Sequence, residues 1–261
     1  MKLTIIISYY RALDNLKLIL QALNHQSVSD FEVILSEDDF NLQTQEFLVT
    51  EASNYHFQIK HLFQQEDKGF RKNMMLNRSI MVAKSEKIVF IDGDCIPHRH
   101  FAQAYIEHIQ DGYIASGRSV MLGEKFTQTL KSSKDLGLLK WLNLLFSDSK
   151  SIKEGVYFPI ISLSYRKRGL LGRNWGVMKN HLLEINGFDE DYVLAGVGED
   201  VDIEWRLLAN GLKTKSVKNK AIVYHIYHPR SYSDADVKIN YKLLDAKLEA
   251  NKVFCENGIV K

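Results

Sequence analysis

Hydrophobic and polar positions follow two alternating patterns over residues 1–120 of the chain. Short apolar runs are typical of strands buried on both faces, whereas apolar residues three or four positions apart are typical of helices. The apolar runs predict strands at Leu3–Ile7, Glu32–Leu35, Phe57–Leu62 and Lys87–Ile91. The helical spacing predicts helices at Asp14–His25, Leu42–Ala52, Arg71–Ala83 and His98–Gln110. This alternation indicates an α/β fold with a mostly parallel central sheet flanked by helices.

The segment 123–172 interrupts the alternation. Its most apolar part is Leu136–Phe146, which we interpret as a helical plug or flap. The alternative is a basic amphipathic helix on an anionic membrane, so that residues 131–153 would make a peripheral membrane contact. The lysines that favour this alternative are Lys131, Lys134, Lys140, Lys150 and Lys153.

A second set of elements begins at Asn174. The pattern predicts strands at Asn174–Met178 and Ala221–Tyr224, and helices at His181–Asn186, Glu199–Asn210 and Ala235–Cys255. No internal repeat or low-complexity tract separates these parts. We therefore expect one domain over residues 1–261, made of a first half (1–120), a variable insertion (121–172), a second half (173–231) and a C-terminal helix (232–261).

Composition and charge narrow the class of protein. The chain has 261 residues, 45% of them hydrophobic, which is enough for a sizeable core, and its net charge of +2 argues against a nucleic-acid partner. Cys95 and Cys255 have no CxxC spacing, so we expect reduced, buried thiols in a reducing cytosol. The N-terminal apolar run is too short for a signal peptide, and no run approaches the ~18 apolar residues of a membrane span. The expected location is cytoplasmic, either soluble or peripheral at the inner face of the membrane.

The first candidate chemistry lies at the end of the predicted strand Lys87–Ile91. Asp92 and Asp94 follow this strand directly, and Gly93 between them allows a sharp turn. Ligands of parallel sheets bind at the carboxyl ends of the strands, and adjacent carboxylates repel each other unless a cation lies between them. A divalent ion with oxygen ligands is the functional interpretation, and an ordinary polar turn is the alternative.

Two further clusters follow later strands and loops. His225 and His228 come at the end of the predicted strand Ala221–Tyr224, and at least one of them is a candidate metal ligand. Glu199 and Asp200 begin a predicted helix, where acids also complement the helix dipole. A carboxylate held there could act as a general base toward a hydroxyl group.

Acids and cations near the second and third strands suggest a nucleotide. Glu37 and Asp38 could accept hydrogen bonds from a base or from ribose hydroxyls. Lys68 and Arg71 lie at a helix start, where cations oppose the dipole unless an anion such as a diphosphate is bound. The sequence has neither GxxxxGK[ST] nor GxGxxG, so a P-loop NTPase or a dinucleotide enzyme is not supported.

Together these stretches resemble the inverting nucleotide-sugar glycosyltransferases of family 2, which have the GT-A fold. Within that family the chain is most similar to the branch with a galactosyltransferase-like C-terminal half. The resemblance spans most of residues 3–229. It is carried by Ile6–Arg11, Val33–Asp38, Asp67–Arg71 running on to Phe90–Pro97, and Asn186–Asp189 through Gly198–Ile203.

The resemblance implies a role for each motif. Residues 1–120 would bind the nucleotide sugar, and residues 173–231 would hold the acceptor and the catalytic groups. Asp92 and Asp94 would hold Mn²⁺ or Mg²⁺ against the diphosphate, with His225 and His228 as remaining ligands. Catalysis is implied for Asp200 as base and Glu199 as its acceptor-binding neighbour. Contacts to the donor are implied for Ser8, Tyr10, Arg11, Glu37, Asp38, Lys68, Arg71, Asp92, Gly93, Asp94, Trp175 and Gly176.

The chain departs from the family pattern in two loops. Phe40 follows Glu37-Asp-Asp where the family has a glycine and a serine, and Leu194–Gly198 replaces the aromatic-rich loop of galactosyltransferases. The resemblance therefore does not imply galactose as the donor sugar. It implies transfer of a hexose-type sugar from a UDP-sugar to a glycan or lipid-linked acceptor in surface polysaccharide synthesis.

Two other functions compete with that of a glycosyltransferase. A haloacid-dehalogenase-like phosphatase needs a nucleophilic aspartate after the first strand, where this chain has Ser8. A catalytically silent domain that binds a glycan or a partner protein stays open, although Asp92, Asp94, Asp200 and His228 are all present.

Overall fold

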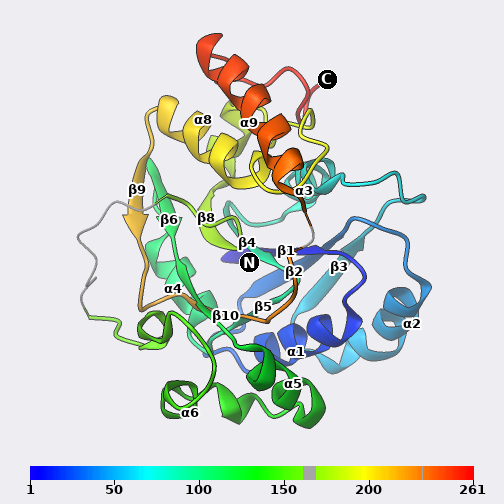
Figure 1. Ribbon diagram of the computed structural model, residues 1–261, viewed down its shortest axis with the longest axis vertical. Helices are drawn as coiled ribbons and strands as arrows, with labels where there is room; N and C mark the ends of the chain where they lie inside the picture. Colours follow the sequence, from blue (N-terminus) through cyan, green and yellow to red (C-terminus); the bar gives the residue numbers. More distant parts are fainter. Residues whose placement is uncertain (161–168, 231) are drawn as a thin grey trace.

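A seven-stranded sheet forms the centre of the computed structural model, which describes residues 1–160, 169–230 and 232–261 (Figure 1). For residues 198 and 199 it describes the backbone alone. The strand order is β3-β2-β1-β4-β8-β6-β9, and only β8 runs antiparallel to its neighbours, so the mostly parallel sheet is confirmed. The bounds are β1 (Leu3–Tyr9), β2 (Phe31–Glu37), β3 (Gln58–Leu62), β4 (Lys87–Asp92), β6 (Tyr113–Ser116), β8 (Asn174–Met178) and β9 (Lys213–Ser216).

A small second sheet adjoins the carboxyl end of β4. It consists of β5 (Cys95–Pro97), β10 (Ile222–His225) and β7 (Arg118–Met121), with β10 in the middle. Only Gly93 and Asp94 separate β4 from β5, and His225 pairs with Cys95 across the sheet. Segments 130 residues apart in the chain therefore meet where the central sheet ends.

Helices cover both faces of the central sheet because its strands bury side chains on both. In β1, Leu3, Ile5 and Ile7 belong to one apolar cluster, whereas Ile6 faces the other. The first cluster includes side chains of α1, α2 and α4, and the second those of α3, α7 and α8. The helices are α1 (Leu13–Asn24), α2 (Leu42–Glu51), α3 (Lys72–Val82), α4 (Phe101–His108), α5 (Glu124–Ser133), α6 (Trp141–Leu145), α7 (Lys179–Glu184), α8 (Ile203–Ala209) and α9 (Asp234–Glu249).

The insertion differs most from the sequence-based expectation. The single helix expected at Leu136–Phe146 is instead a 3₁₀ turn, Leu136–Leu139, followed by the short helix α6. The break lies at Lys140, whose backbone is extended (ψ 139°). Helix α5 precedes them and was not expected, since its sequence is mostly polar. In Figure 1, α5 and α6 lie at one end of the molecule and α8 and α9 at the other.

Two predicted helix boundaries in the second half also change. The expected helix Glu199–Asn210 begins as a π-helical turn, Gly198–Asp202, before α8. Helix α9 ends at Glu249 rather than Cys255, because Asn251 adopts a left-handed conformation (φ 48°) that a helix does not continue through. Helix α9 starts with a capping box in which Ser233 and Asp236 bond reciprocally. In the described part of the chain no helix is both long and apolar enough to cross a membrane.

Candidate active site

The turn after β4 depends on the absence of a side chain at residue 93. Strands β1 and β4 are paired with Ser8 opposite Asp92, and the Gly93 N–H donates to the Ser8 carbonyl oxygen at 2.6 Å. A Cβ at Gly93 would lie 2.8 Å from that same oxygen, which is too close for any other residue. The chain therefore crosses the end of β1 tightly, and Asp92 and Asp94 lie on the wall of a cavity.

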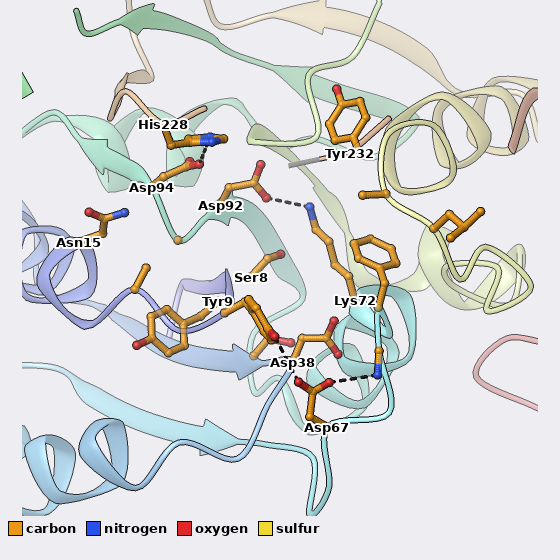
Figure 2. A pocket seen from close by; sticks show the side chains of 18 of the residues that line it. Ser8, Tyr9, Asn15, Asp38, Asp67, Lys72, Asp92, Asp94, His228 and Tyr232 are labelled. Carbon is orange, nitrogen blue, oxygen red and sulfur yellow. Dashed lines mark hydrogen bonds and ion pairs between the residues drawn. The ribbon is translucent and has the colours of Figure 1, made fainter. Parts of the chain in front are cut away.

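The cavity has a volume of about 690 Å³ and lies at the carboxyl edge of the sheet (Figure 2). One side comes from the ends of β1, β2 and β4, and a second side comes from the start of α3. The remaining side comes from the second half of the chain. Residues that line the cavity include Ser8, Tyr9, Tyr10, Asn15, Asp38, Lys72, Asp92, Asp94, Leu194, Ala195, His228, Tyr232 and Asp236.

Asp94 is the centre of an acid–imidazole cluster. Its Oδ2 lies 3.0 Å from His228 Nε2 and 3.4 Å from His225 Nε2. Burial alone would raise the pKa of Asp94, but the His228 hydrogen bond and the charge of His225 hold it at about 2. The same hydrogen bond raises the pKa of His228, whereas burial lowers the pKa of His225. Asp94 is thus an ionised carboxylate with two imidazoles directed at it.

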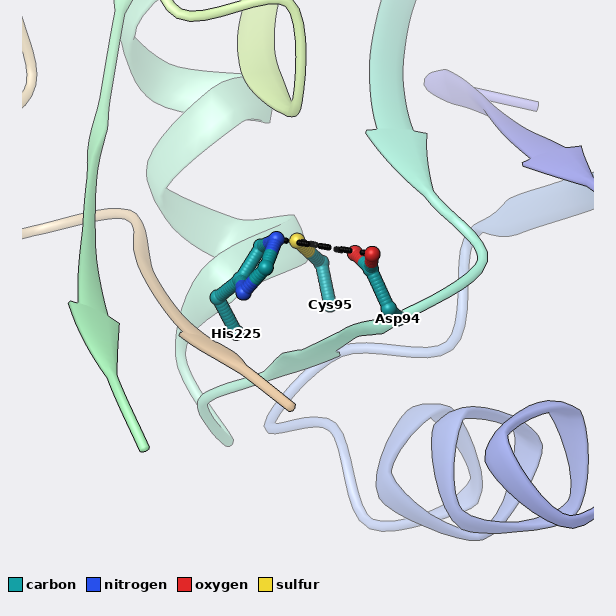
Figure 3. A group of neighbouring side chains, drawn as sticks. All are labelled: Asp94, Cys95 and His225. Atoms are coloured by element: carbon teal, nitrogen blue, oxygen red, sulfur yellow. Dashed lines mark hydrogen bonds and ion pairs between the residues drawn. The ribbon is translucent and has the colours of Figure 1, made fainter. Parts of the chain in front are cut away.

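Cys95 lies between Asp94 and His225 in this cluster (Figure 3). Its Sγ lies 3.3 Å from Asp94 Oδ1, and the ligand atoms of Asp94, Cys95 and His225 lie within 4.8 Å of one another. The thiol is fully buried, and burial raises its pKa well above the ordinary value. As a protonated thiol it donates to Asp94 and helps to orient that carboxylate. Sequence reasoning expected a reduced, buried thiol here and gave it no part in the site.

The donor atoms in this cluster fit a divalent ion. Asp92 and Asp94 present carboxylate oxygens and His228 an imidazole nitrogen at the cavity wall, with His225 directly behind. Mg²⁺ favours oxygen ligands, whereas Mn²⁺ and similar ions also accept imidazole. The carboxylate oxygens and imidazole nitrogens together therefore fit a divalent ion such as Mn²⁺ or Mg²⁺.

A family model places the chain among known proteins. The model described as glycosyl transferase family 2 matches residues 4–174, which is more than half of the chain. The chain belongs to glycosyl transferase family 2. A second model, described as the N-terminal domain of galactosyltransferase, matches residues 156–229. No curated protein matches the sequence.

Solved structures of glycosyltransferases share the fold. The mannosyltransferase PcManGT from Pyrobaculum calidifontis, in complex with GDP-Man and Mn²⁺, has a TM-score of 0.62 and 16% identity, over 96% of this chain. S. aureus TarS has a TM-score of 0.60 and 15% identity, over 97% of this chain. The aligned region spans 64% of the PcManGT chain and 41% of the TarS chain. TarS 1–349 in complex with UDP-GlcNAc has a TM-score of 0.56 and 12% identity, over 89% of this chain and 60% of that chain. The expected GT-A fold is therefore confirmed.

Lys72 pairs with the first acid of the Asp92–Asp94 pair in this family 2 chain. Its Nζ lies 2.9 Å from Asp92 Oδ1, and its side chain lines the cavity. Lys68 and Arg71, the cations expected at the donor, line a neighbouring cavity of about 640 Å³ instead. The signal for Lys72 was present in the sequence, since all three cations surround the start of α3, but only the backbone direction decides which one faces the acids.

Of the two acids expected to bind the nucleoside, Asp38 lines the cavity and Glu37 does not. Asp38 lines the cavity and accepts hydrogen bonds from the Arg71 N–H (2.8 Å) and from Gln64 Nε2 (2.5 Å). Burial raises the pKa of Asp38 to about 6, despite these bonds. Glu37 is fully buried and pairs with His61 at 2.6 Å, so it does not face the cavity.

The loop after β1 divides its residues between the cavity and a salt-bridge network. Ser8 and Tyr10 line the cavity. The Arg11 guanidinium instead pairs with Asp39 at 2.5 Å and with Asp67 at 3.0 Å. Arg11 thus ties the loop to its neighbours rather than pointing at a donor.

Trp175 and Gly176 are not among the described residues that line the cavity, contrary to the role that the resemblance implies for them. Trp175 is fully buried and stacks on Phe90 with ring centroids 4.5 Å apart. A Cβ at Gly176 would lie 2.9 Å from the Ile88 carbonyl oxygen, so this glycine permits close packing inside the sheet. Both belong to β8, whose pairing with β4 and β6 places them in the core.

The two residues expected to act on the acceptor lie in the π-helical turn before α8. The Asp200 carboxylate accepts a hydrogen bond from the Val201 N–H at 2.8 Å. Asp200 is not among the described residues that line the cavity, although Leu194 and Ala195 of the preceding loop are. The side chain of Glu199 falls outside the described part of the structure.

Asp202, the next acid after Glu199 and Asp200 in the sequence, has a structural role. It is fully buried, and Arg206 Nε donates to it at 2.8 Å. The same guanidinium donates to the carbonyl oxygens of Ile185 and Gly187. Asp202 therefore fixes the start of α8 instead of facing a substrate.

Several cavity residues were not found from the sequence. Tyr232 comes just before α9 and Asp236 from its first turn, a region that the pattern placed outside the site. Asn15 and Ser36 are buried residues whose side-chain oxygens have no hydrogen-bond partner in the described structure. Both line the cavity, so they offer polar groups to a bound donor. No motif marked Asn15, Tyr232 or Asp236, and Ser36 lies in the matched stretch Val33–Asp38 without an implied role.

Proposed function

We propose that this family 2 chain is a metal-dependent inverting glycosyltransferase. It would move a hexose-type sugar from a UDP-sugar to a hydroxyl of a glycan or lipid-linked acceptor, in surface polysaccharide synthesis. The observation that carries the proposal is the convergence of His225 and His228 on Asp94, beside Asp92, at the wall of a cavity large enough for a nucleotide sugar. Complexes of PcManGT with GDP-Man and Mn²⁺ and of TarS with UDP-GlcNAc support a nucleotide-sugar donor.

The acids and imidazoles would hold the donor's diphosphate through the ion. A bound divalent ion supplies positive charge that stabilises the departing nucleoside diphosphate. Lys72 adds a second positive charge from the opposite side of Asp92, at the start of α3. Asp38 and Tyr10 lie at the nucleoside end of the cavity in this proposal, and Asn15 and Ser36 offer it further polar groups.

Asp200 is the proposed general base. It would accept the proton of the acceptor hydroxyl as the oxygen attacks the anomeric carbon opposite the leaving diphosphate, which inverts the configuration. Support comes from its place in the chain, since Asp200 follows the loop whose Leu194 and Ala195 line the cavity. We expect Asp200→Asn to keep nucleotide-sugar binding and to lose transfer by roughly 10²- to 10⁴-fold. Normal turnover by this variant would exclude Asp200 as the base.

The test of the whole proposal is nucleotide release from a panel of donors. The chain is incubated with UDP-sugars and GDP-mannose in the presence of Mn²⁺, Mg²⁺ or EDTA, and free UDP or GDP is measured. We expect release from a UDP-sugar with Mn²⁺ and none with EDTA. Asp94→Asn should abolish it, whereas Asp245→Asn, an exposed acid on α9, should not.

The rival is a catalytically silent domain with the same fold. It predicts that UDP binds in a calorimeter with Mn²⁺ but that no donor is turned over, even with acceptor glycans added. If nucleotide were released only from GDP-mannose, the chain would still be a transferase, but its donor would carry GDP rather than UDP.

A further inference from the structure

An exposed apolar surface lies on the insertion, at the end of the molecule that carries α5 and α6 (Figure 1). It is centred on α6 and the residue after it. Phe146 is 87% exposed and Leu142 65%, and Trp141 and Leu145 are also exposed. Isolated apolar residues are common on protein surfaces, but four large ones within six positions form a patch. We refer to residues 131–153 as the insertion surface.

The insertion surface is held in place by the fold. Leu139 and Leu144 are buried and belong to the core cluster on that side of the sheet. The carboxylate of Asp148 accepts hydrogen bonds from the backbone N–H groups of Lys125 and Phe126 at the start of α5. Lys150 forms a backbone bridge with Met121 of β7. The exposed side chains are therefore presented by an anchored segment.

The insertion surface carries a net positive charge. Residues 131–153 contain five lysines (Lys131, Lys134, Lys140, Lys150 and Lys153) and two acids, Asp135 and Asp148. All five lysines are exposed, and in the described parts of the chain none of them forms an ion pair. Both acids are engaged with backbone N–H groups, Asp135 with that of Gly137 at 2.8 Å. Lysines next to exposed apolar side chains are the combination that binds the headgroup region of an anionic bilayer.

The charge of the segment, rather than the area of the patch, favours a bilayer as the occupant, because five exposed lysines complement the phosphates of anionic lipids. A bilayer requires no matching surface, because leucine and aromatic side chains enter the acyl boundary while lysines contact the phosphates.

The insertion surface is also connected to the candidate metal site. Thr127 of α5 accepts a hydrogen bond from the Tyr227 N–H at 3.1 Å, between His225 and His228 along the chain. The Leu122 N–H donates to the His225 carbonyl oxygen at 2.9 Å. The part of the chain that leads into the insertion surface, from Leu122 to Thr127, therefore packs directly beside the histidines.

We propose that the insertion surface is a peripheral docking site for anionic lipid membranes, with Leu142 and Phe146 entering the bilayer and the lysines binding lipid phosphates. This goes beyond the proposed transfer reaction, and it does not depend on it. Docking here would hold the cavity at the membrane, where a lipid-linked acceptor would be found.

The test measures binding of the full chain to vesicles by co-sedimentation. Vesicles of phosphatidylcholine alone are compared with vesicles that also contain phosphatidylglycerol. We expect binding to the anionic vesicles, weakened by added salt. The double substitution Leu142→Ser/Phe146→Ser should lower the partition coefficient at least tenfold. Lys134→Gln/Lys140→Gln should lower it by roughly ten- to thirtyfold. The matched control is Val49→Ser on α2, since Val49 is as exposed as Phe146 but lies outside the insertion surface.

Several results would overturn the proposal. These are no binding of the unchanged chain to anionic vesicles, equal binding of neutral and anionic vesicles, or unchanged binding by the serine variants. If size-exclusion chromatography shows a dimer that Leu142→Ser/Phe146→Ser dissociates, the surface is an interface between copies instead. Thermal unfolding of each variant checks that it is folded. Nucleotide release in solution should stay unchanged in all of them, which separates this proposal from the transferase proposal.

Discussion

At the scale of single residues, the structure sorts the charged groups by the direction of the backbone that carries them. Asp92 and Asp94 both face the cavity because Gly93 turns the chain over the end of β1. Among the three cations at the start of α3, only Lys72 lines the cavity beside them. The sequence shows that such charges are present, but a shift of one residue on a helix changes the face by about 100°.

Comparison of two lysine variants tests this assignment. Lys72→Gln should lower kcat/KM for the donor by roughly 10- to 100-fold, the size expected for loss of one charge-assisted contact to a diphosphate. Lys68→Gln should change it less than about threefold, because that side chain lines the neighbouring cavity. Steady-state nucleotide release at constant Mn²⁺ measures both. If Lys68→Gln lowered kcat/KM more than Lys72→Gln, the diphosphate would be bound by Lys68, as the sequence predicted.

The raised pKa of Asp38 has a consequence for stability. Burial raises this pKa to about 6 in the folded chain, above the value near 4 in an unfolded chain. The folded state therefore binds the proton more tightly, and this group lowers stability as pH rises from about 4 to about 6. The unchanged chain should lose about 2–3 kcal/mol of its free energy of unfolding through Asp38 between pH 4 and pH 7. Asp38→Asn lacks this loss, so its stability relative to the unchanged chain should be higher at pH 7 than at pH 4 by that amount. Urea unfolding at both pH values measures the change, and an equal difference at both would contradict the raised pKa.

At the scale of elements, helix α9 shapes one wall of the cavity. Asn240 is buried, and its Nδ2 donates to the carbonyl oxygens of Leu194 and Ala195 at 2.7 and 3.3 Å. The Tyr232 ring covers Gly196, where an added Cβ would lie 3.0 Å from Cε2. The chain lacks the aromatic loop of galactosyltransferases here, and Tyr232, which comes just before α9, lines the cavity instead.

Removing the bond from α9 to this loop should affect substrate binding more than folding. Asn240→Ala should raise the KM for donor or acceptor by roughly 5- to 10-fold, since one hydrogen bond contributes about 1 kcal/mol. Lys242→Ala, at an exposed position on the same helix, serves as the control and should leave KM unchanged. Substrate-saturation curves for both variants give the comparison. A change confined to the melting temperature would show that α9 only stabilises the fold.

At the scale of the whole molecule, the cavity joins segments from Ser8 to Asp236. A ligand that binds there stabilises the folded chain as a unit, because the unfolded chain has no such site. The two sheets meet at Asp94, whose carbonyl oxygen accepts from the Ile226 N–H at 2.8 Å. In the proposed function, an ion held by Asp94 would therefore act on both sheets.

Thermal unfolding with UDP and Mn²⁺ tests this linkage. At a concentration about 100-fold above Kd, binding adds about 2.7 kcal/mol. For a chain of this length that corresponds to a rise in melting temperature of roughly 5–10 °C. EDTA should cancel most of the rise, because in the proposed function the diphosphate contacts depend on an ion held by Asp92, Asp94 and the histidines. A rise that persists in EDTA would show that the nucleotide binds without a metal.

The sequence by itself determined the strand–helix alternation and the strand-end acids, since burial on two faces and sharp turns leave periodic patterns along the chain. It also predicted a metal site from Asp94, His225 and His228 because each follows a predicted strand, but only the fold shows that the histidines reach Asp94 from a second sheet. It could not detect β5, β6, β7 or β9, which have three or four residues each and too little length to show a period. Only the tertiary structure decided that Trp175 is core, that Asp202 is bound by Arg206, and that Lys72, Tyr232 and Asp236 face the cavity. The physical reason is that the role of a side chain depends on which neighbours the fold brings to it, and those neighbours are distant in the sequence.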